Sequence, residues 1–268
     1  MTALSSFALS ATFRAGLALF AALLYFGAFA CCFSKRRAIK RLSLGLWIGG
    51  TVVNAVLVGN NWLVNGYVPF VSMYQVLTFL GVTFSLVYVY MRYVHDGEFM
   101  KAYFMCFQGV IMTGVFFMGR TAATWTFPPA LQSAYFIPHV FSYMISYSLV
   151  GVAALMTCLS IFCREGEVRR RMERGIYELV LTGFPFMVLG MLLGALWANA
   201  CWGNYWSWDN KEVWSLVTVM ALAVYLHFRR HESLAKYAKY FVILAFIFEI
   251  ITLFFVGMFG GDSLHTYN

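Results

Sequence analysis

Tryptophan is concentrated in one short segment of the chain. Five of the eight tryptophans lie between residues 197 and 214, in WANACWGNYWSWDNKEVW, and they are Trp197, Trp202, Trp206, Trp208 and Trp214. Glycine, asparagine and aspartate residues, Asp209 among them, separate the rings. Several aromatic faces with a few hydrogen-bonding groups suit a large, flat, apolar ligand. An interfacial belt of indoles explains one or two tryptophans at a span end but not five in one segment, so we favour a ligand platform.

Three histidines border apolar runs. His139 follows Pro138, His227 lies in VYLHFRR, and His265 lies in the C-terminal GGDSLHTYN. Haem iron takes one axial imidazole from each side of the ring, so His139 and His265 could hold haem against the tryptophans if both reach the same face. The alternative for each histidine is that it merely ends a helix at an interface. His227 could be a ligand at a second site.

The composition shows what kind of fold must position these residues. Of the 268 residues, 62% are hydrophobic and only 11% are charged, whereas soluble domains are roughly half apolar and about a quarter charged. A soluble globule cannot hide so much apolar surface, and a disordered chain has the opposite composition. We therefore expect an all-α, polytopic integral membrane protein with about eight transmembrane helices. The sequence supplies eight stretches of suitable length, at 13–33, 42–59, 73–94, 102–119, 139–163, 175–196, 212–228 and 240–259.

The basic residues predict the orientation. Sixteen of the 19 lysines and arginines fall in alternate loops, and only Arg14, Arg120 and Lys211 fall on the other side. Basic loops stay in the cytoplasm, so both termini are predicted to face outward. The basic residues suit anionic lipids, and we expect no nucleic acid partner despite a net charge of +8.

This topology sorts the candidate ligands. The tryptophan segment, His139 and His265 share the outer face, while His227 lies near the cytoplasmic end of the seventh span. A helix of about 16 residues separates the two faces by roughly 24 Å, so His227 cannot share an iron with His139. Asp209 is expected to cap the seventh span, and Glu249, in the middle of the eighth, must be protonated, paired or facing an aqueous cavity.

The domain organisation is predicted to be simple. No repeat, low-complexity stretch or long linker divides the chain, so residues 1–268 are expected to form one transmembrane domain. A cleaved signal at residues 1–30 is the less favoured alternative, because the basic cluster follows the first apolar run instead of preceding it.

The tryptophan segment and its surroundings resemble one family. WGNYWSWDNKEVW is similar to the WWD signature of haem-handling membrane proteins, and its KE-containing form is most similar to the CcsA family, also called ResC, of the CcsB/CcsA cytochrome c synthesis system. The segments LQSAYFIPHVFSYMISYSLVG, YLHFRR and GGDSLH occur in the family's order, and PFVSMYQ resembles an earlier family segment. The resemblance covers residues 60–268. The chain departs from the family in having Gln75 where an acid is common and in lacking a CcsB-like region.

The resemblance implies a function in cytochrome c maturation. Proteins of this family act with a CcsB (ResB-like) partner, bring haem b to the outer face and join it to the CxxCH cysteines of apocytochrome c. This is a holocytochrome c synthase activity, expected only in the complex. The resemblance assigns His139 and His265 to the outer haem and His227 to an inner haem whose other ligand comes from CcsB. A thioredoxin-like thiol-reducing protein is a further expected partner, and a bacterial cytoplasmic membrane, or alternatively a thylakoid membrane, is the expected location.

The expected mechanism is positional. The histidines fix the iron, the tryptophans fix the ring, and proximity accelerates attachment, so no catalytic acid or base is expected. The alternatives are a haem exporter without a covalent step, a membrane electron carrier with permanent b haems, and a loop that only docks a partner protein.

Overall fold

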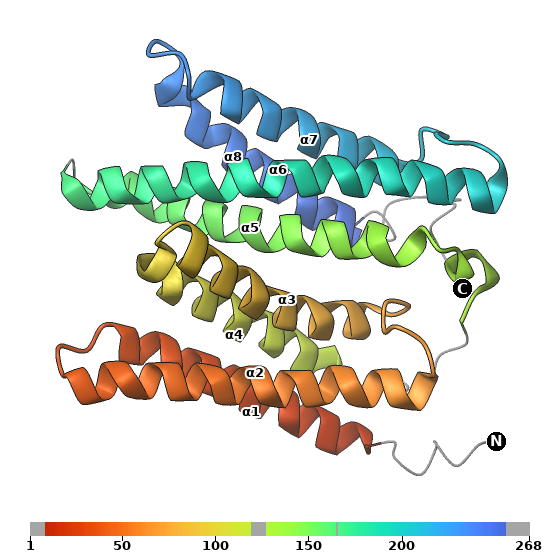
Figure 1. Ribbon diagram of the computed structural model, residues 1–268, viewed down its shortest axis with the longest axis horizontal. Helices are drawn as coiled ribbons and strands as arrows, with labels where there is room; N and C mark the ends of the chain where they lie inside the picture. The colour runs from red at the N-terminus through yellow and green to blue at the C-terminus, as the bar shows by residue number, and fades with distance from the viewer. Residues whose placement is uncertain (1–8, 119–126, 165, 256–268) are drawn as a thin grey trace. The chain divides into compact units, whose positions relative to one another are not determined.

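The structure is a computed structural model that describes residues 9–118, 127–164 and 166–255. These residues are mainly helical and contain no strand (Figure 1). Among them are eight helices long and apolar enough to cross a membrane. The helices are α1 Ala11–Cys32, α2 Arg37–Asn65, α3 Met73–Val94, α4 Lys101–Met118, α5 Phe136–Phe162, α6 Glu167–Trp202, α7 Asn210–Phe228 and α8 Ala235–Ile250. A π-helical turn, η4 Ile251–Phe255, continues α8, and short 3₁₀ turns precede α4 and α5.

The predicted all-α, polytopic fold is confirmed, with each predicted span falling largely within one helix. The side on which the termini lie stays a prediction, and both ends of the chain fall outside the described residues.

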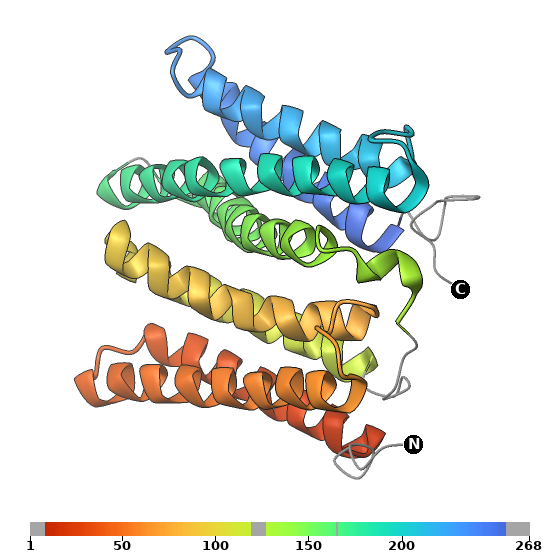
Figure 2. The same ribbon diagram turned by 45° about the vertical axis from the view of Figure 1, so that its right-hand side comes forward.

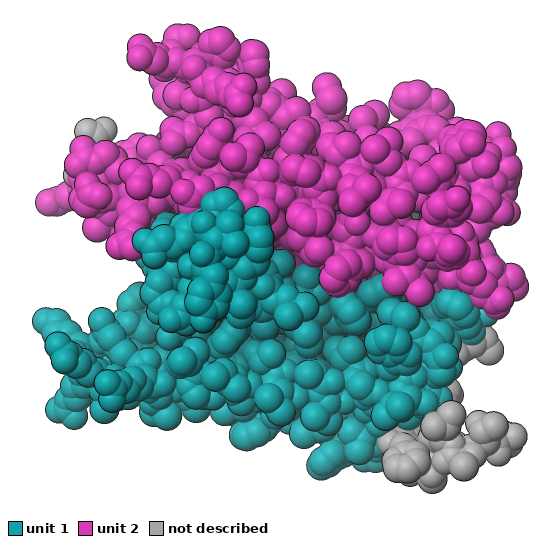
Figure 3. Space-filling model, viewed as in Figure 1, with its two compact units in different colours: residues 1–127 teal, residues 128–268 magenta. Residues whose placement is uncertain are grey.

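The chain divides into two compact units, residues 1–127 and 128–268 (Figure 3). Unit 1 holds α1 to α4 and unit 2 holds α5 to α8. That the two units act together as the single domain expected from the sequence stays a prediction.

Unit 1 packs around small residues and one polar network. Buried alanines on α1, such as Ala18 and Ala21, allow α2 and α4 to approach closely. Gln108 on α4 accepts a hydrogen bond from Trp47 at 2.9 Å and donates to the carbonyl of Gly81 and the hydroxyl of Ser85. The network satisfies polar groups that would be costly to bury in an apolar setting.

Unit 2 positions the tryptophan segment. The views in Figures 1 and 2 show α5 beside α6 and α7 beside α8, and α8 also contacts α5. Glycines on α6 face α5: a Cβ at Gly183 would lie 3.2 Å from Leu149, and one at Gly190 would lie 2.9 Å from the Tyr143 ring. Close approach of the two helices therefore depends on the missing side chains, and it places the α5 N-terminus beside the end of α6.

Candidate functional site

His139 lies in the first turn of α5 and is held by α6. Its Nδ1 is 2.7 Å from the carbonyl oxygen of Gly190. A carbonyl only accepts hydrogen bonds, so Nδ1 carries the proton and Nε2 is the nitrogen able to bind a metal. A hydrogen bond of this kind fixes the tautomer and orientation of many metal-binding histidines.

Aromatic rings and a glycine enclose the His139 imidazole. Trp197 lies nearly parallel to it, with ring centroids 5.8 Å apart and planes at 22°, and Tyr143 meets it edge-on at 4.9 Å. A Cβ at Gly194 would lie 2.6 Å from Cε1 and 2.7 Å from Nδ1 of His139. The imidazole therefore occupies the space that any side chain at position 194 would need.

Trp197 is a buried supporting residue, only 2% exposed. Its Nε1 donates to the carbonyl oxygen of Ala130 at 2.8 Å, and the thiol of Cys201 donates to the same oxygen at 3.0 Å. Trp202 meets Trp197 edge-on at 5.0 Å. Trp197 thus fixes the imidazole and ties the end of α6 to the segment before α5.

The conformation of the loop between α6 and α7 is fixed at both of its ends. Gly203 ends α6 in the left-handed conformation that glycine adopts without strain, with φ at 78°. Asp209 and Glu212 form a capping box at the start of α7, which confirms the predicted Asp209 cap. Glu212 also accepts from the backbone N–H and hydroxyl of Ser207, so one carboxylate holds the loop and the helix start together.

The most accessible indole in the loop is that of Trp208. It is 70% exposed and meets Trp206 edge-on at 5.8 Å. The backbone of Trp208 has φ of 60°, a left-handed conformation that residues other than glycine seldom adopt unless the surrounding structure holds them in it. The Nε1 of Trp206 is buried without a hydrogen-bond partner among the described residues. These two rings offer an apolar surface and one unused donor.

The candidate residues therefore separate into groups. His139, Trp197 and Trp202 form one cluster, Trp206 and Trp208 form a pair, and Trp214 packs against Phe248 of α8. His265 lies outside the described residues, and its pairing with His139 stays a prediction.

His227 lies at the opposite end of α7 from Asp209. The 19 residues of α7 span about 28 Å at a rise of about 1.5 Å per residue, which agrees with two separate sites. His227 is exposed, and its ring centroid is 4.7 Å from that of His231, one turn further along the chain. The sequence did not suggest this pairing.

Glu249 is buried in α8, with 3% exposure. Neither carboxyl oxygen has a hydrogen-bond partner among the described residues. The choice among the three predicted alternatives for Glu249, which are protonation, a partner and an aqueous cavity, stays a prediction.

Three residues that shape the His139 site were not identified from the sequence: Tyr143, Gly190 and Gly194. Tyr143 lies one helical turn after His139, and the two glycines lie one turn apart on α6. The i, i+4 spacing of each pair indicates that its two residues share one helix face. Only the packing of α5 on α6 shows that the glycine face lies against the histidine.

A family model described as cytochrome C assembly protein matches residues 70–262. The chain belongs to the cytochrome c assembly protein family. The match includes His139, His227 and the whole tryptophan segment, and it ends just before His265.

Similar proteins support the family that the motifs indicate. The chain is 26% identical to cytochrome c biogenesis protein CcsA of Guillardia theta over 88% of both chains. It is 28% identical to CcsA of Chlamydomonas reinhardtii, over 87% of this chain and 69% of the relative. It is 29% identical to CcsA of Helianthus annuus, over 79% and 81%. The chain thus has the features of a CcsA-type cytochrome c biogenesis protein, as the motifs predict.

A solved structure has the same fold. The cytochrome c haem lyase CcmF superposes with a TM-score of 0.69 at 16% identity, over 94% of this chain. The chain spans about half (48%) of the CcmF chain. At this identity the likeness establishes a shared helical fold.

Proposed function

We propose that the chain, in a complex with a CcsB-type membrane partner, presents haem b at the outer membrane face for attachment to the CxxCH cysteines of apocytochrome c. The observation that carries the proposal is the His139 site. An imidazole with Nδ1 bound to the Gly190 carbonyl and one face against Trp197 is pre-oriented to ligate a metal through Nε2.

The residues present fit such a ligand. Haem supplies iron for axial ligation and vinyl groups for thioether formation. His139 would hold the iron through Nε2, and His265 is proposed as its second ligand. The exposed ring of Trp208, held edge-on by Trp206, would offer an apolar surface for the porphyrin ring. Holding the reacting groups in one orientation would supply the acceleration, so no residue of this chain need act as an acid or base.

His227 is proposed to bind haem at an inner site together with a ligand from the partner. Its exposure at the end of α7 suits a site completed by a second protein. A thioredoxin-like protein that keeps the substrate cysteines reduced is a further proposed partner.

The test compares the wild-type complex with two single variants. His139→Ala and His265→Ala should each abolish the outer-site haem spectrum and cytochrome c formation together. Haem retained with a normal spectrum in both variants would refute the ligand assignment. Release of haem without any requirement for apocytochrome c would favour an exporter instead, and tightly held, non-exchanging haem would favour an electron carrier.

A further inference from the structure

A basic pocket lies within unit 2, at the end opposite the tryptophan segment. It has a volume of about 120 Å³ and lies between the C-terminal ends of α5 and α7 and the N-terminal ends of α6 and α8. Four basic side chains and one acidic side chain line it, namely Arg169, Arg229, Lys236, Lys239 and Glu173. The proposed outer site uses none of these residues.

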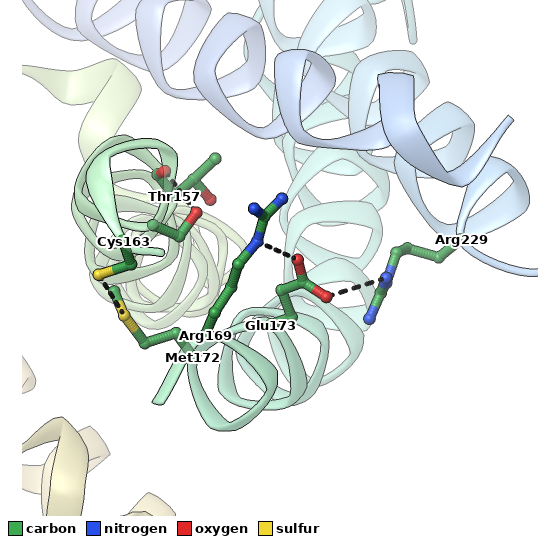
Figure 4. A network of polar contacts seen from close by, with 7 residues as sticks. Thr157, Cys163, Arg169, Met172, Glu173 and Arg229 are labelled. Carbon is green, nitrogen blue, oxygen red and sulfur yellow. Dashed lines mark hydrogen bonds and ion pairs between the residues drawn. The ribbon is translucent and has the colours of Figure 1, made fainter. Parts of the chain in front are cut away.

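The one acid of the pocket is held by two arginines (Figure 4). Nε of Arg169 is 3.2 Å from one carboxylate oxygen of Glu173, and Nη1 of Arg229 is 3.9 Å from the other. The Glu173 charge is therefore largely balanced within this network. Lys236 and Lys239 add two further positive charges, so the pocket as a whole attracts an anion.

A buried hydroxyl in the pocket can donate a further hydrogen bond. Tyr225 is only 2% exposed, and no acceptor for its hydroxyl proton lies among the described residues, because the neighbouring Arg229 guanidinium can only donate. Burying a polar group without a partner is costly, and a bound oxyanion would accept this hydrogen bond. The pocket thus combines positive charge with an unused donor.

The size and surroundings of the pocket indicate which anion it binds. Pockets for drug-sized ligands measure roughly 300 Å³ or more, so this one suits a single small oxyanion. Ile161 lines it, and the neighbouring Phe162 is 85% exposed on a helix apolar enough to span the membrane. A phosphate in the pocket would therefore have apolar surface beside it for acyl chains.

We propose that this pocket binds the headgroup phosphate of an anionic phospholipid. The two arginines and two lysines attract the phosphate, the Tyr225 hydroxyl donates to it, and the acyl chains lie along the end of α5. Basic pockets between membrane helices on the cytoplasmic side bind anionic lipid headgroups in this way, and the distribution of basic residues predicts that side for this pocket.

The experiment measures lipid retention by native mass spectrometry. The full chain, with its membrane partner where the two copurify, is mixed in detergent with equal amounts of phosphatidylglycerol and phosphatidylcholine. Wild type should retain phosphatidylglycerol preferentially. Lys236→Gln combined with Lys239→Gln should weaken this retention roughly 25-fold, because each basic side chain near a membrane surface contributes about fivefold to affinity.

The matched control is Lys40→Gln combined with Arg41→Gln, which removes two exposed basic groups from the start of α2, in a segment predicted to lie on the same side. It should leave retention unchanged. Equal loss in the control, or equal retention of both lipids by wild type, would overturn the proposal. Binding of inorganic phosphate without any lipid preference would also overturn it, by assigning the pocket to free phosphate.

Tyr225→Phe keeps the assay decisive if the lysine variant does not fold. It removes only the buried hydroxyl, so folding should persist while phosphatidylglycerol binds several-fold more weakly. Unchanged affinity in a folded Tyr225→Phe protein would contradict the role of the hydroxyl. The assay involves no haem, so its outcome is independent of the function proposed for the outer site.

Discussion

The imidazole of His139 and the indole of Trp197 lie nearly parallel, with ring centroids 5.8 Å apart and planes at 22°. One ring is the proposed iron ligand and the other is buried and anchored to the Ala130 carbonyl. The orientation of the ligand therefore depends on the packing of the end of α6, so substitutions that never touch haem should alter haem binding.

Gly194→Ala should displace the His139 ring. The added methyl group would lie 2.6 Å from Cε1, closer than atoms pack, so the imidazole must move. Changes that disturb the orientation of a metal-binding histidine cost about 10-fold to 100-fold in affinity. Haem titration followed by absorption should show a loss of this size. Gly59→Ala is the control, because a Cβ there meets no atom within 4 Å. Equal affinity in both variants would contradict the close contact.

Trp197→Ala and Trp208→Ala should affect different properties. The first opens a cavity and removes a buried hydrogen bond, so it should lower the free energy of unfolding by about 3–5 kcal/mol. The second truncates a 70% exposed ring and should change that free energy by less than about 0.5 kcal/mol, while it reduces haem binding. Thermal unfolding in detergent and haem titration measure the two effects. Normal haem binding in Trp208→Ala would favour an interfacial belt over a ligand platform.

Glu212→Gln should loosen the loop between α6 and α7. The carboxylate accepts from Ser207 and from the Asp209 N–H, and the amide offers a weaker, uncharged acceptor. Loss of a cap costs about 1 kcal/mol, so amide hydrogens between residues 203 and 212 should exchange about fivefold faster. Hydrogen–deuterium exchange mass spectrometry measures this rate. The exposed Glu232 provides the control substitution, Glu232→Gln. Equal exchange in the two variants would show that the loop does not depend on Glu212.

His227→Ala should leave the outer site intact. The residue lies about 26 Å along the axis from the start of α7, near the other end of a continuous helix. Spectra of the complex should lose the inner-site haem while the signal that depends on His139 persists. Loss of both signals in a folded variant would show that the two sites are not independent.

The sequence predicted the eight apolar spans, and some of the helices extend beyond them. The sixth span was predicted from residue 175, yet α6 begins at Glu167. Hydropathy detects only the apolar part of a helix, and the charged first turns of α6 are also helical, with Arg169 and Glu173 paired one turn apart. Similarly, α2 continues to Asn65, past the predicted end at 59, and the side chain of Asn61 is buried and donates to Thr78.

The site was predictable in its residue types but not in its geometry. Five tryptophans and a histidine at a helix start were visible in the sequence. The sequence did not show which indole is buried, because Trp197 and Trp208 lie in equally aromatic surroundings along the chain. The structure distinguishes them, because Trp197 packs against α5 and donates to the Ala130 carbonyl, whereas Trp208 lies in the loop after α6 and is 70% exposed. Every residue type has the same main-chain acceptor, so a pattern of side chains does not reveal which carbonyl is used.

The Ala130 carbonyl accepts hydrogen bonds from both Trp197 and Cys201. Every residue type carries that oxygen, so the alanine side chain can be replaced freely wherever the backbone keeps its path. The indole donor at position 197 has no such substitute. Across species, the two partners of this single hydrogen bond should therefore differ sharply in how much variation they tolerate.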